Sequence, residues 1–195
     1  MQPTKAQAIT LLEEGGALNP GPWIQHSYAV AQCAQRIARR CGLDPEHAYI
    51  LGLLHDIGRR YGFTYLKHTI DGYRFLLDKG YPDPARICIT HVFSTKSLDD
   101  YIGKIDVTPG ELDEILAFVQ QATFNDYDRL IQLCDTLAGA TVMDMHARIA
   151  DVERRYGRYP KTKRDAAEHL KAYFETKCGE NIYRIVTDDE TLWGL

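Results

Sequence analysis

Hydrophobic residues recur along most of the chain at intervals of three and four positions, the spacing that places side chains on one face of an α-helix. Alternation with a period of two is scarce, and only the segment 181–187, NIYRIVT, is a candidate for a short strand. The pattern predicts an all-α protein. Helices are expected over residues 4–14, 23–41, 45–57, 65–79, 84–92, 109–122, 126–156 and 162–178, and the seventh can break near Gly139.

Residues that favour helix ends support these boundaries. Asp44 precedes Pro45, which is the order of an N-cap followed by proline in the first turn of a helix. Four glycines each follow a helical pattern and are expected to end it, namely Gly42, Gly58, Gly80 and Gly157.

The most hydrophobic of these helices, in the stretch YILGLLHDIGRRYG at residues 49–62, carries a histidine and an aspartate side by side. His55 follows Leu51 by four residues and shares its face. Asp56 projects about 100° further round, over Gly52, where the missing side chain leaves room. An isolated carboxylate buried among apolar residues costs on the order of tens of kcal/mol. We therefore expect a positive partner for Asp56.

Other histidines and an aspartate also fall on the hydrophobic faces of helices. His26 precedes Val30 by four residues, and Asp135 follows Ile131 by four. A single buried histidine is more often a hydrogen-bonded core residue, and a buried aspartate can cap a helix or pair with an arginine. The complete set is His26, His55, Asp56, His68, His91 and Asp135.

Four neutral imidazoles and two carboxylates are ligands that suit a divalent transition metal such as Fe, Mn, Co, Ni or Zn. Helical bundles build metal sites from inward-facing side chains on several helices. Helical phase thus leaves two interpretations open, core residues with separate partners or a centre that holds one or two ions. The remaining histidines serve as controls: His47 and His169 are expected in solvent, and His146 and Asp144 should point to opposite sides of a helix.

Composition limits the kinds of protein that fit. A chain of 195 residues with 45% hydrophobic and 26% charged residues is typical of a single domain in solution, here spanning residues 1–195. The net charge of −4 argues against a nucleic-acid polymer as partner. The five cysteines contain no CxxC pair, and the N-terminus lacks the pattern of a secretory signal. The apolar run at residues 48–54 is far shorter than a membrane span. We expect a cytoplasmic protein.

Three segments resemble the HD-domain family of metal-dependent phosphohydrolases: HSYAV at 26–30, LLHDIGR at 53–59 and LCDTLAG at 133–139. The HDIG form of the doublet is the most specific of them. In this resemblance His26, His55, Asp56 and Asp135 match the core metal ligands of the family. The likeness covers about residues 22–145 and implies a helical bundle with a metal site in its centre. Residues 146–195 are then a C-terminal helical extension.

Some members of the family hold two metals and add two histidines between the doublet and the last aspartate. His68 and His91 occupy those places in order, which resembles the bacterial diadenosine tetraphosphatases of the HD family. The tyrosine-proline signature of the HD-GYP enzymes is absent after Gly58, where the sequence runs RRYGFTY. That subfamily is disfavoured.

The resemblance implies hydrolysis of a phosphate ester or anhydride, with a nucleotide as the expected small anionic substrate, by metal-activated water. Asp56 would bridge the two metals and act in catalysis together with Arg59. Arg59 and Lys96 are the candidates for binding phosphate. If a single metal binds, His68 or His91 would be free to protonate the leaving group.

Two other functions stay open at this stage. Di-iron oxygenases with the HD fold, which act on inositol or aminophosphonates, use a similar set of four histidines and two aspartates in the same order. Because the oxygenases and the phosphohydrolases share these ligands, the ligand set alone does not distinguish oxygenation from hydrolysis. A non-catalytic nucleotide sensor is the third candidate, and it has little need of the complete ligand set. The sequence leaves the oligomeric state undetermined.

Overall fold

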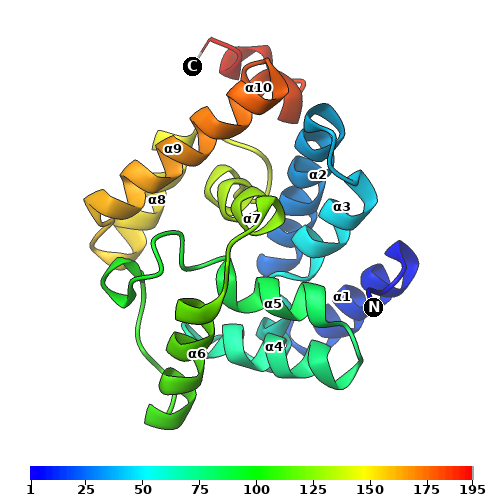
Figure 1. The fold of residues 1–195 in the computed structure, drawn as a ribbon, viewed down its shortest axis with the longest axis vertical. Coiled ribbons are helices and arrows are strands. Elements are labelled where there is room, and N and C mark those ends of the chain that lie inside the picture. Colours follow the sequence, from blue (N-terminus) through cyan, green and yellow to red (C-terminus); the bar gives the residue numbers. More distant parts are fainter. Residues whose placement is uncertain (195) are drawn as a thin grey trace.

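The computed structural model describes residues 1–194, and within that range every regular element is a helix (Figure 1). This confirms the all-α prediction. The α-helices are α1 (Lys5–Leu18), α2 (Trp23–Cys41), α3 (Pro45–Leu54), α4 (Lys67–Asp78), α5 (Pro82–Thr90), α6 (Pro109–Gln121), α7 (Asp126–Leu137), α8 (Met145–Tyr156), α9 (Lys161–Cys178) and α10 (Ile182–Val186). Short 3-10 helices are η1 (Ile57–Tyr61), η2 (Leu98–Asp100) and η3 (Glu190–Leu192).

The helix that carries the histidine–aspartate doublet is shorter than predicted. It ends at Leu54, and the chain turns at Asp56 (φ −104°, ψ 13°) into η1. Gly58 therefore lies inside η1 and does not end α3. Its lack of a side chain serves a different purpose, because a Cβ atom at this position would lie 1.9 Å from the carbonyl oxygen of His68. Gly58 lets η1 pass directly against the backbone of α4.

Of two predictions near the C-terminus, the break of helix 126–156 near Gly139 is confirmed and the strand at 181–187 is wrong. A turn in which Ala138 and Val142 form an isolated β-bridge divides the first segment into α7 and α8. Asp144 caps the start of α8, and its carboxylate accepts a hydrogen bond from the backbone N–H of Ala147 at 2.9 Å. The expected strand at 181–187 is the short helix α10, capped by Asn181. Local capping thus decides both segments.

Helix α7 lies in the middle of the molecule, against α2, α3, α5, α8 and α9 (Figure 1). Helices α2 and α3 form one close pair and α4 and α5 form another. The close approach of α2 and α3 requires Gly52, because a Cβ atom there would lie 2.8 Å from the Cα atom of Ala31. The space over Gly52 is thus occupied by the backbone of α2, not by Asp56 as predicted.

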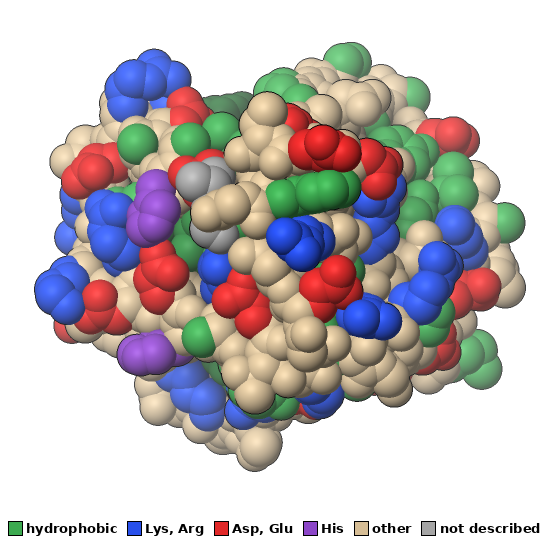
Figure 2. All heavy atoms as spheres, turned by 90° about the horizontal axis from the view of Figure 1, so that it is seen from above, with side chains coloured by type: hydrophobic (Ala, Val, Ile, Leu, Met, Phe, Trp, Pro, Cys, Tyr) green, Lys and Arg blue, Asp and Glu red, His purple; other side chains and the backbone are tan. Residues whose placement is uncertain are grey.

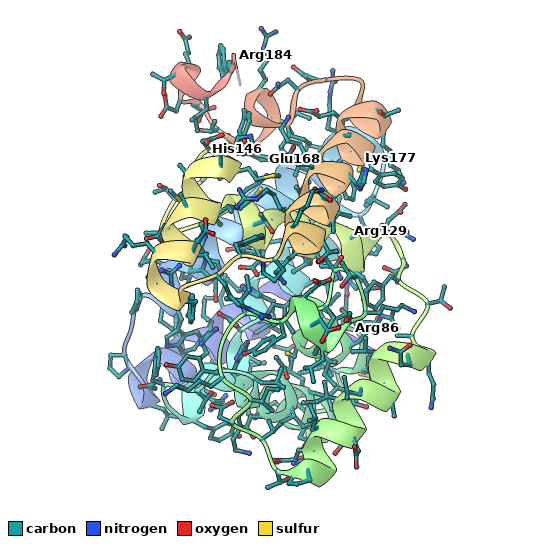
Figure 3. All side chains as sticks on the ribbon, turned by 90° about the vertical axis from the view of Figure 1, so that its left-hand side faces the viewer. Arg86, Arg129, His146, Glu168, Lys177 and Arg184 are labelled. Atoms are coloured by element: carbon teal, nitrogen blue, oxygen red, sulfur yellow. The ribbon has the colours of Figure 1, made fainter. Side chains whose placement is uncertain are left out.

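The C-terminal helices pack into the same hydrophobic core as the helices that carry the motifs. Phe174 of α9 and Tyr183 of α10 belong to the buried cluster that contains Val30 of α2 and Leu133 of α7. Polar contacts on the surface reinforce this packing. Figure 3 shows Glu168 and Lys177 on opposite sides of α9: Glu168 lies 3.5 Å from the imidazole of His146 on α8, and Lys177 pairs with a carboxylate of α7.

The molecular surface mixes charges of both signs. Acidic and basic side chains alternate over the face drawn in Figure 2. His169 is exposed, as predicted, whereas His47 is half-buried. Among residues 1–194, no helix combines the length and the apolar character needed to cross a bilayer.

Candidate metal centre

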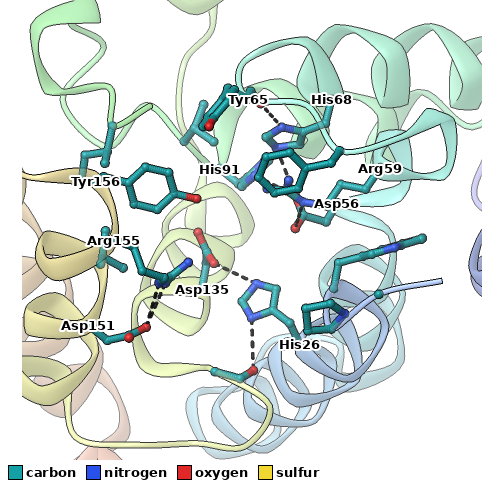
Figure 4. Close-up of a pocket in the computed structure, with 18 of the residues that line it drawn as sticks. His26, Asp56, Arg59, Tyr65, His68, His91, Asp135, Asp151, Arg155 and Tyr156 are labelled. Carbon is teal, nitrogen blue, oxygen red and sulfur yellow. Dashed lines mark hydrogen bonds and ion pairs between the residues drawn. The ribbon is translucent and has the colours of Figure 1, made fainter. Parts of the chain in front are cut away.

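The six predicted ligands converge on one space in the molecule. Figure 4 labels five of them, all except His55. Helix α2 supplies His26, the junction of α3 and η1 supplies His55 and Asp56, and α7 supplies Asp135. The other two are His68, in the first turn of α4, and His91, directly after α5.

One group of ligand atoms lies on the side of α2 and α7. The Nε2 atom of His26 is 3.0 Å from the Oδ1 atom of Asp135. The imidazole of His55 packs edge-on against that of His26, with ring centroids 5.2 Å apart. One ligand atom from each of these three residues lies within 4.8 Å of the other two, close enough for one ion to bind all three.

A second group surrounds Asp56. Its Oδ1 atom is 3.1 Å from Nε2 of His68 and 3.6 Å from Nε2 of His91. Its Oδ2 atom is 3.8 Å from Nε2 of His55. His55, Asp56 and His91 again offer ligand atoms within 4.8 Å of one another. His55 therefore belongs to both groups, and the two oxygens of Asp56 face different histidines.

Backbone carbonyl groups fix the orientation of all four imidazoles. A carbonyl oxygen can only accept a hydrogen bond, so the proton of each neutral ring resides on Nδ1 and Nε2 keeps its lone pair for a metal. The pairs are His26 with Gly139 (3.2 Å), His55 with Gly52 (2.7 Å), His91 with Ile87 (3.0 Å), and His68 with Tyr65.

The ligand atoms include buried polar groups that have no hydrogen-bond partner in the described chain. They are Nε2 of His55, Nε2 of His68 and Oδ1 of Asp56. Burial of such atoms without a partner costs free energy, and native proteins rarely leave them unsatisfied. Divalent cations bound by the two groups would satisfy these atoms. Imidazole nitrogens and carboxylate oxygens are also common ligand atoms for Fe, Mn, Co, Ni and Zn.

Electrostatics keeps the groups in the protonation state that a metal requires. Burial lowers the pKa of His55 to about 4, against the opposing effect of Asp56. Burial and the charge of Arg59 also lower the pKa of His68. Burial alone would raise the pKa of Asp56, but Arg59, His55 and His68 hold it well below its usual value. At neutral pH the imidazoles of His55 and His68 are therefore uncharged and the carboxylate of Asp56 is ionised.

The two residues predicted to bind phosphate have different positions. Arg59 lines the site: its Nε atom donates to Oδ2 of Asp56 at 2.6 Å, and Nη1 donates to the carbonyl of Thr64 at 3.2 Å. Lys96 does not reach it. Its ammonium group donates to the carbonyl of Ala122 and lies 5.1 Å from the ring centroid of Phe124. The structure gives no support to the expectation that Lys96 binds substrate.

A cavity of about 470 Å³ opens onto the ligand cluster. Helices α8 and α9 and the segment between them form the wall opposite η1 and α4, and none of their residues was predicted to belong to the site. This wall contains Arg148, Asp151, Arg155, Tyr156, Tyr159 and Lys163. The sequence did carry one signal, because residues 148, 151, 152, 155 and 156 follow the spacing of a single helical face.

A comparison with protein families matches the HD domain over residues 23–140. This range is more than half of the chain and contains all six predicted ligands. The chain belongs to the HD domain family. Members of the HD domain family are mostly metal-dependent hydrolases. The basic wall of the cavity lies outside the matched range, since α8 begins at Met145. Searches among curated proteins and among solved structures found no match.

Proposed function

We propose that this HD domain protein is a phosphohydrolase that cleaves a phosphate ester or anhydride and that its substrate is a nucleotide. The observation that carries the proposal is the position of Asp56 between two groups of imidazoles. Oδ2 faces His55, and Oδ1 faces His68 and His91. A carboxylate with its two oxygens directed to different histidines is suited to bridge two ions.

The residues fit one or two divalent ions. His26, His55, Asp56 and Asp135 would hold the first, and Asp56, His68 and His91 the second. Bound divalent ions supply a water that loses its proton near neutral pH and positive charge for the phosphate oxygens. Arg59 acts through Asp56: its Nε donates to Oδ2 at 2.6 Å and fixes the plane of this carboxylate. Arg59 contacts Asp56 through Nε and Thr64 through Nη1, so its Nη2 atom can donate to a phosphate oxygen.

Aromatic side chains around the cavity support a nucleotide as the substrate. Trp23, Phe63, Tyr65 and Tyr156 line it, and Phe63 is 78% exposed. The rings of Phe63 and Tyr65 lie 5.5 Å apart, and those of Tyr65 and Tyr156 lie 6.4 Å apart. In Figure 4 the phenol of Tyr156 points into the same space as Asp135 and His91. A nucleobase can stack on such faces while its phosphate reaches the ligand cluster.

Phosphate release by protein loaded separately with Mn, Co or Fe tests the proposal. The substrates are nucleoside mono-, di- and triphosphates and dinucleoside tetraphosphates, assayed without oxygen, and Asp56→Asn protein controls for contaminating phosphatases. We expect metal-dependent release that the Asp56→Asn variant lacks. Oxygen consumption that requires iron, on a polyol or a phosphonate and without phosphate release, would instead show an oxygenase. Nucleotide binding without turnover under every metal would show a sensor.

A further inference from the structure

The cavity holds basic side chains that the metal centre does not use. Arg148 and Arg155 come from α8 and Lys163 comes from the first turn of α9. All three follow residue 140, where the match to the HD domain ends. In Figure 4 Arg155 lies across the cavity from Asp56 and His68. The extension therefore places positive charge opposite the ligand cluster.

Lys163 carries a positive charge that no acidic group neutralises directly. Its Nζ atom donates to the carbonyl oxygen of Val92 at 2.9 Å, next to the ligand His91. Within residues 1–194, no carboxylate lies within ion-pair distance of this ammonium group. The side chain is nevertheless partly buried. An ammonium group has three donors, so two of them are available to an anion in the cavity. Burying an unpaired charge is costly, which favours such an anion.

The neighbours of Lys163 hold the start of α9 in place. Thr162 donates a hydrogen bond to the buried carboxylate of Asp100. Arg158, in the segment before α9, donates to the carbonyl oxygens of Asp99 at 2.7 Å and Tyr101 at 2.9 Å. These contacts attach the segment between α8 and α9 to the loop that follows His91. Lys163 is thus fixed beside the metal centre before any ligand binds.

Arg148 adds a second positive charge that is poorly neutralised. Its Nε atom is buried and has no hydrogen-bond partner in the described chain. Its Nη1 atom lies 3.5 Å from Oδ2 of Asp151. The same carboxylate accepts shorter contacts from Arg154 at 2.7 Å and from Arg155 at 3.0 Å. One carboxylate shared by three guanidinium groups leaves positive charge on this wall.

We propose that Lys163 and Arg148 form an anion subsite that binds the non-bridging oxygens of a phosphate monoester while its phosphorus lies at the ligand cluster. This deepens the proposed phosphohydrolase function and rests on it. A monoester carries about 1.5 to 2 negative charges at pH 7, which matches two cations. A phosphodiester carries one negative charge and would leave one cation of the subsite without a partner. The C-terminal extension thus selects terminal phosphoryl groups.

Paired substrates and a matched pair of variants test the subsite. The Lys163→Met variant removes the charge and keeps the length of the side chain. Lys161→Met is its control, because Lys161 is exposed two residues earlier and pairs with Asp165 on the surface. Arg148→Met supplies an independent variant, and Lys163→Arg restores the charge. Metal content and melting temperature are measured for each, followed by the KM and kcat for p-nitrophenyl phosphate and bis(p-nitrophenyl) phosphate.

We expect Lys163→Met to keep its metal and to raise the KM for the monoester by about 10- to 100-fold, the range of one charge-assisted hydrogen bond. The KM for the diester should change less than about threefold, and Lys163→Arg should recover part of the loss. Equal losses on both substrates, or an equal effect of Lys161→Met, would overturn the subsite. If Lys163→Met does not fold, the same comparison is made with Arg148→Met.

Binding of inorganic phosphate separates failure of the subsite from failure of the proposed function. Calorimetry on metal-loaded protein measures this binding without turnover. If the wild type releases no phosphate from any substrate, the phosphohydrolase proposal fails. The subsite is still supported if Lys163→Met weakens phosphate binding by about tenfold or more. It is overturned if the variant binds phosphate as tightly as the wild type, or if the wild type binds none.

Discussion

Gly58 and the backbone carbonyl of His68 are packed so closely that a Cβ atom on the glycine would lie 1.9 Å from the carbonyl oxygen. The same Cβ would lie 2.6 Å from the backbone nitrogen of Gly72. Two residues of the HDIG motif, Asp56 and Gly58, therefore have separate roles around His68. Asp56 faces its imidazole, and Gly58 sets how closely the helix that carries it approaches η1.

Replacing Gly58 with alanine should displace the start of α4. Overpacking of this kind costs about 3 kcal/mol of folding free energy, and the shift should also weaken the ion held by His68. Chemical denaturation and metal analysis measure the two effects. Gly110→Ala is the control, because no atom lies within 4 Å of a Cβ at that position. A Gly58→Ala protein with wild-type stability and metal content would show that the contact is not a constraint.

Replacing Asp56 with alanine should abolish both metal content and activity. The variant loses the carboxylate that faces His55, His68 and His91 and leaves the Nε atom of Arg59 without its acceptor. We expect a loss of about 2 kcal/mol of folding free energy. This is less than the usual cost of breaking a fully buried ion pair, because the Arg59 side chain is 25% exposed and water can solvate its charge. Elemental analysis and denaturation check both effects, with surface Asp165→Ala as control. Full metal occupancy in Asp56→Ala would disprove its assignment as a ligand.

Replacing His68 or His91 with alanine should lower the number of bound ions from two to one. Both imidazoles face Oδ1 of Asp56, whereas His26 and Asp135 lie together in the other group. Elemental analysis of purified His68→Ala and His91→Ala measures the stoichiometry. His169→Ala, an exposed position, should keep both ions. Loss of all metal from either ligand variant would show that the two groups do not bind independently.

Metal-free protein should lose stability as the pH falls from about 6.5 toward 4. The pKa of His55 is about 4 in the folded chain, against an ordinary value of 6.5. Between these values the unfolded chain takes up a proton that the folded chain does not, which costs up to about 1.4 kcal/mol per pH unit. Melting temperatures of chelator-treated protein across this range measure the slope. His55→Gln should flatten it, and His169→Gln should leave it unchanged. An equally steep slope in His55→Gln would place the responsible group elsewhere.

The helical pattern was sufficient to predict the fold class and to select six candidate ligands that the structure brings together. His26 and Asp135 share faces with apolar residues that must point inward, so their direction follows from helical phase. Phase did not reveal the turn at Asp56, where α3 ends at Leu54 and the chain enters η1. That turn depends on the passage of Gly58 against α4, a contact between segments that the sequence alone does not place together.

The opposite wall of the cavity could not be predicted in the same way. Arg148 and Lys163 lie in segments rich in charged residues, which resemble helices exposed to solvent. They border the site because α8 and α9 fold back over α7 and are attached to the loop after His91. Lys96 shows the converse error. It follows a ligand histidine closely in sequence, yet its ammonium group bonds to the carbonyl of Ala122 away from the cavity. Proximity along the chain did not indicate which basic residue reaches the metal centre.

Anomalous diffraction from crystals of metal-loaded protein, recorded at the absorption edge of the bound ion, tests the central claim most directly. We predict anomalous peaks at about 2.0 to 2.2 Å from Nε2 of His26 and His55 and from carboxylate oxygens of Asp56 and Asp135. A second peak should lie beside Oδ1 of Asp56, toward His68 and His91. Fully loaded protein with no peak among these side chains, or with its ion elsewhere, would contradict the metal centre and the function built on it.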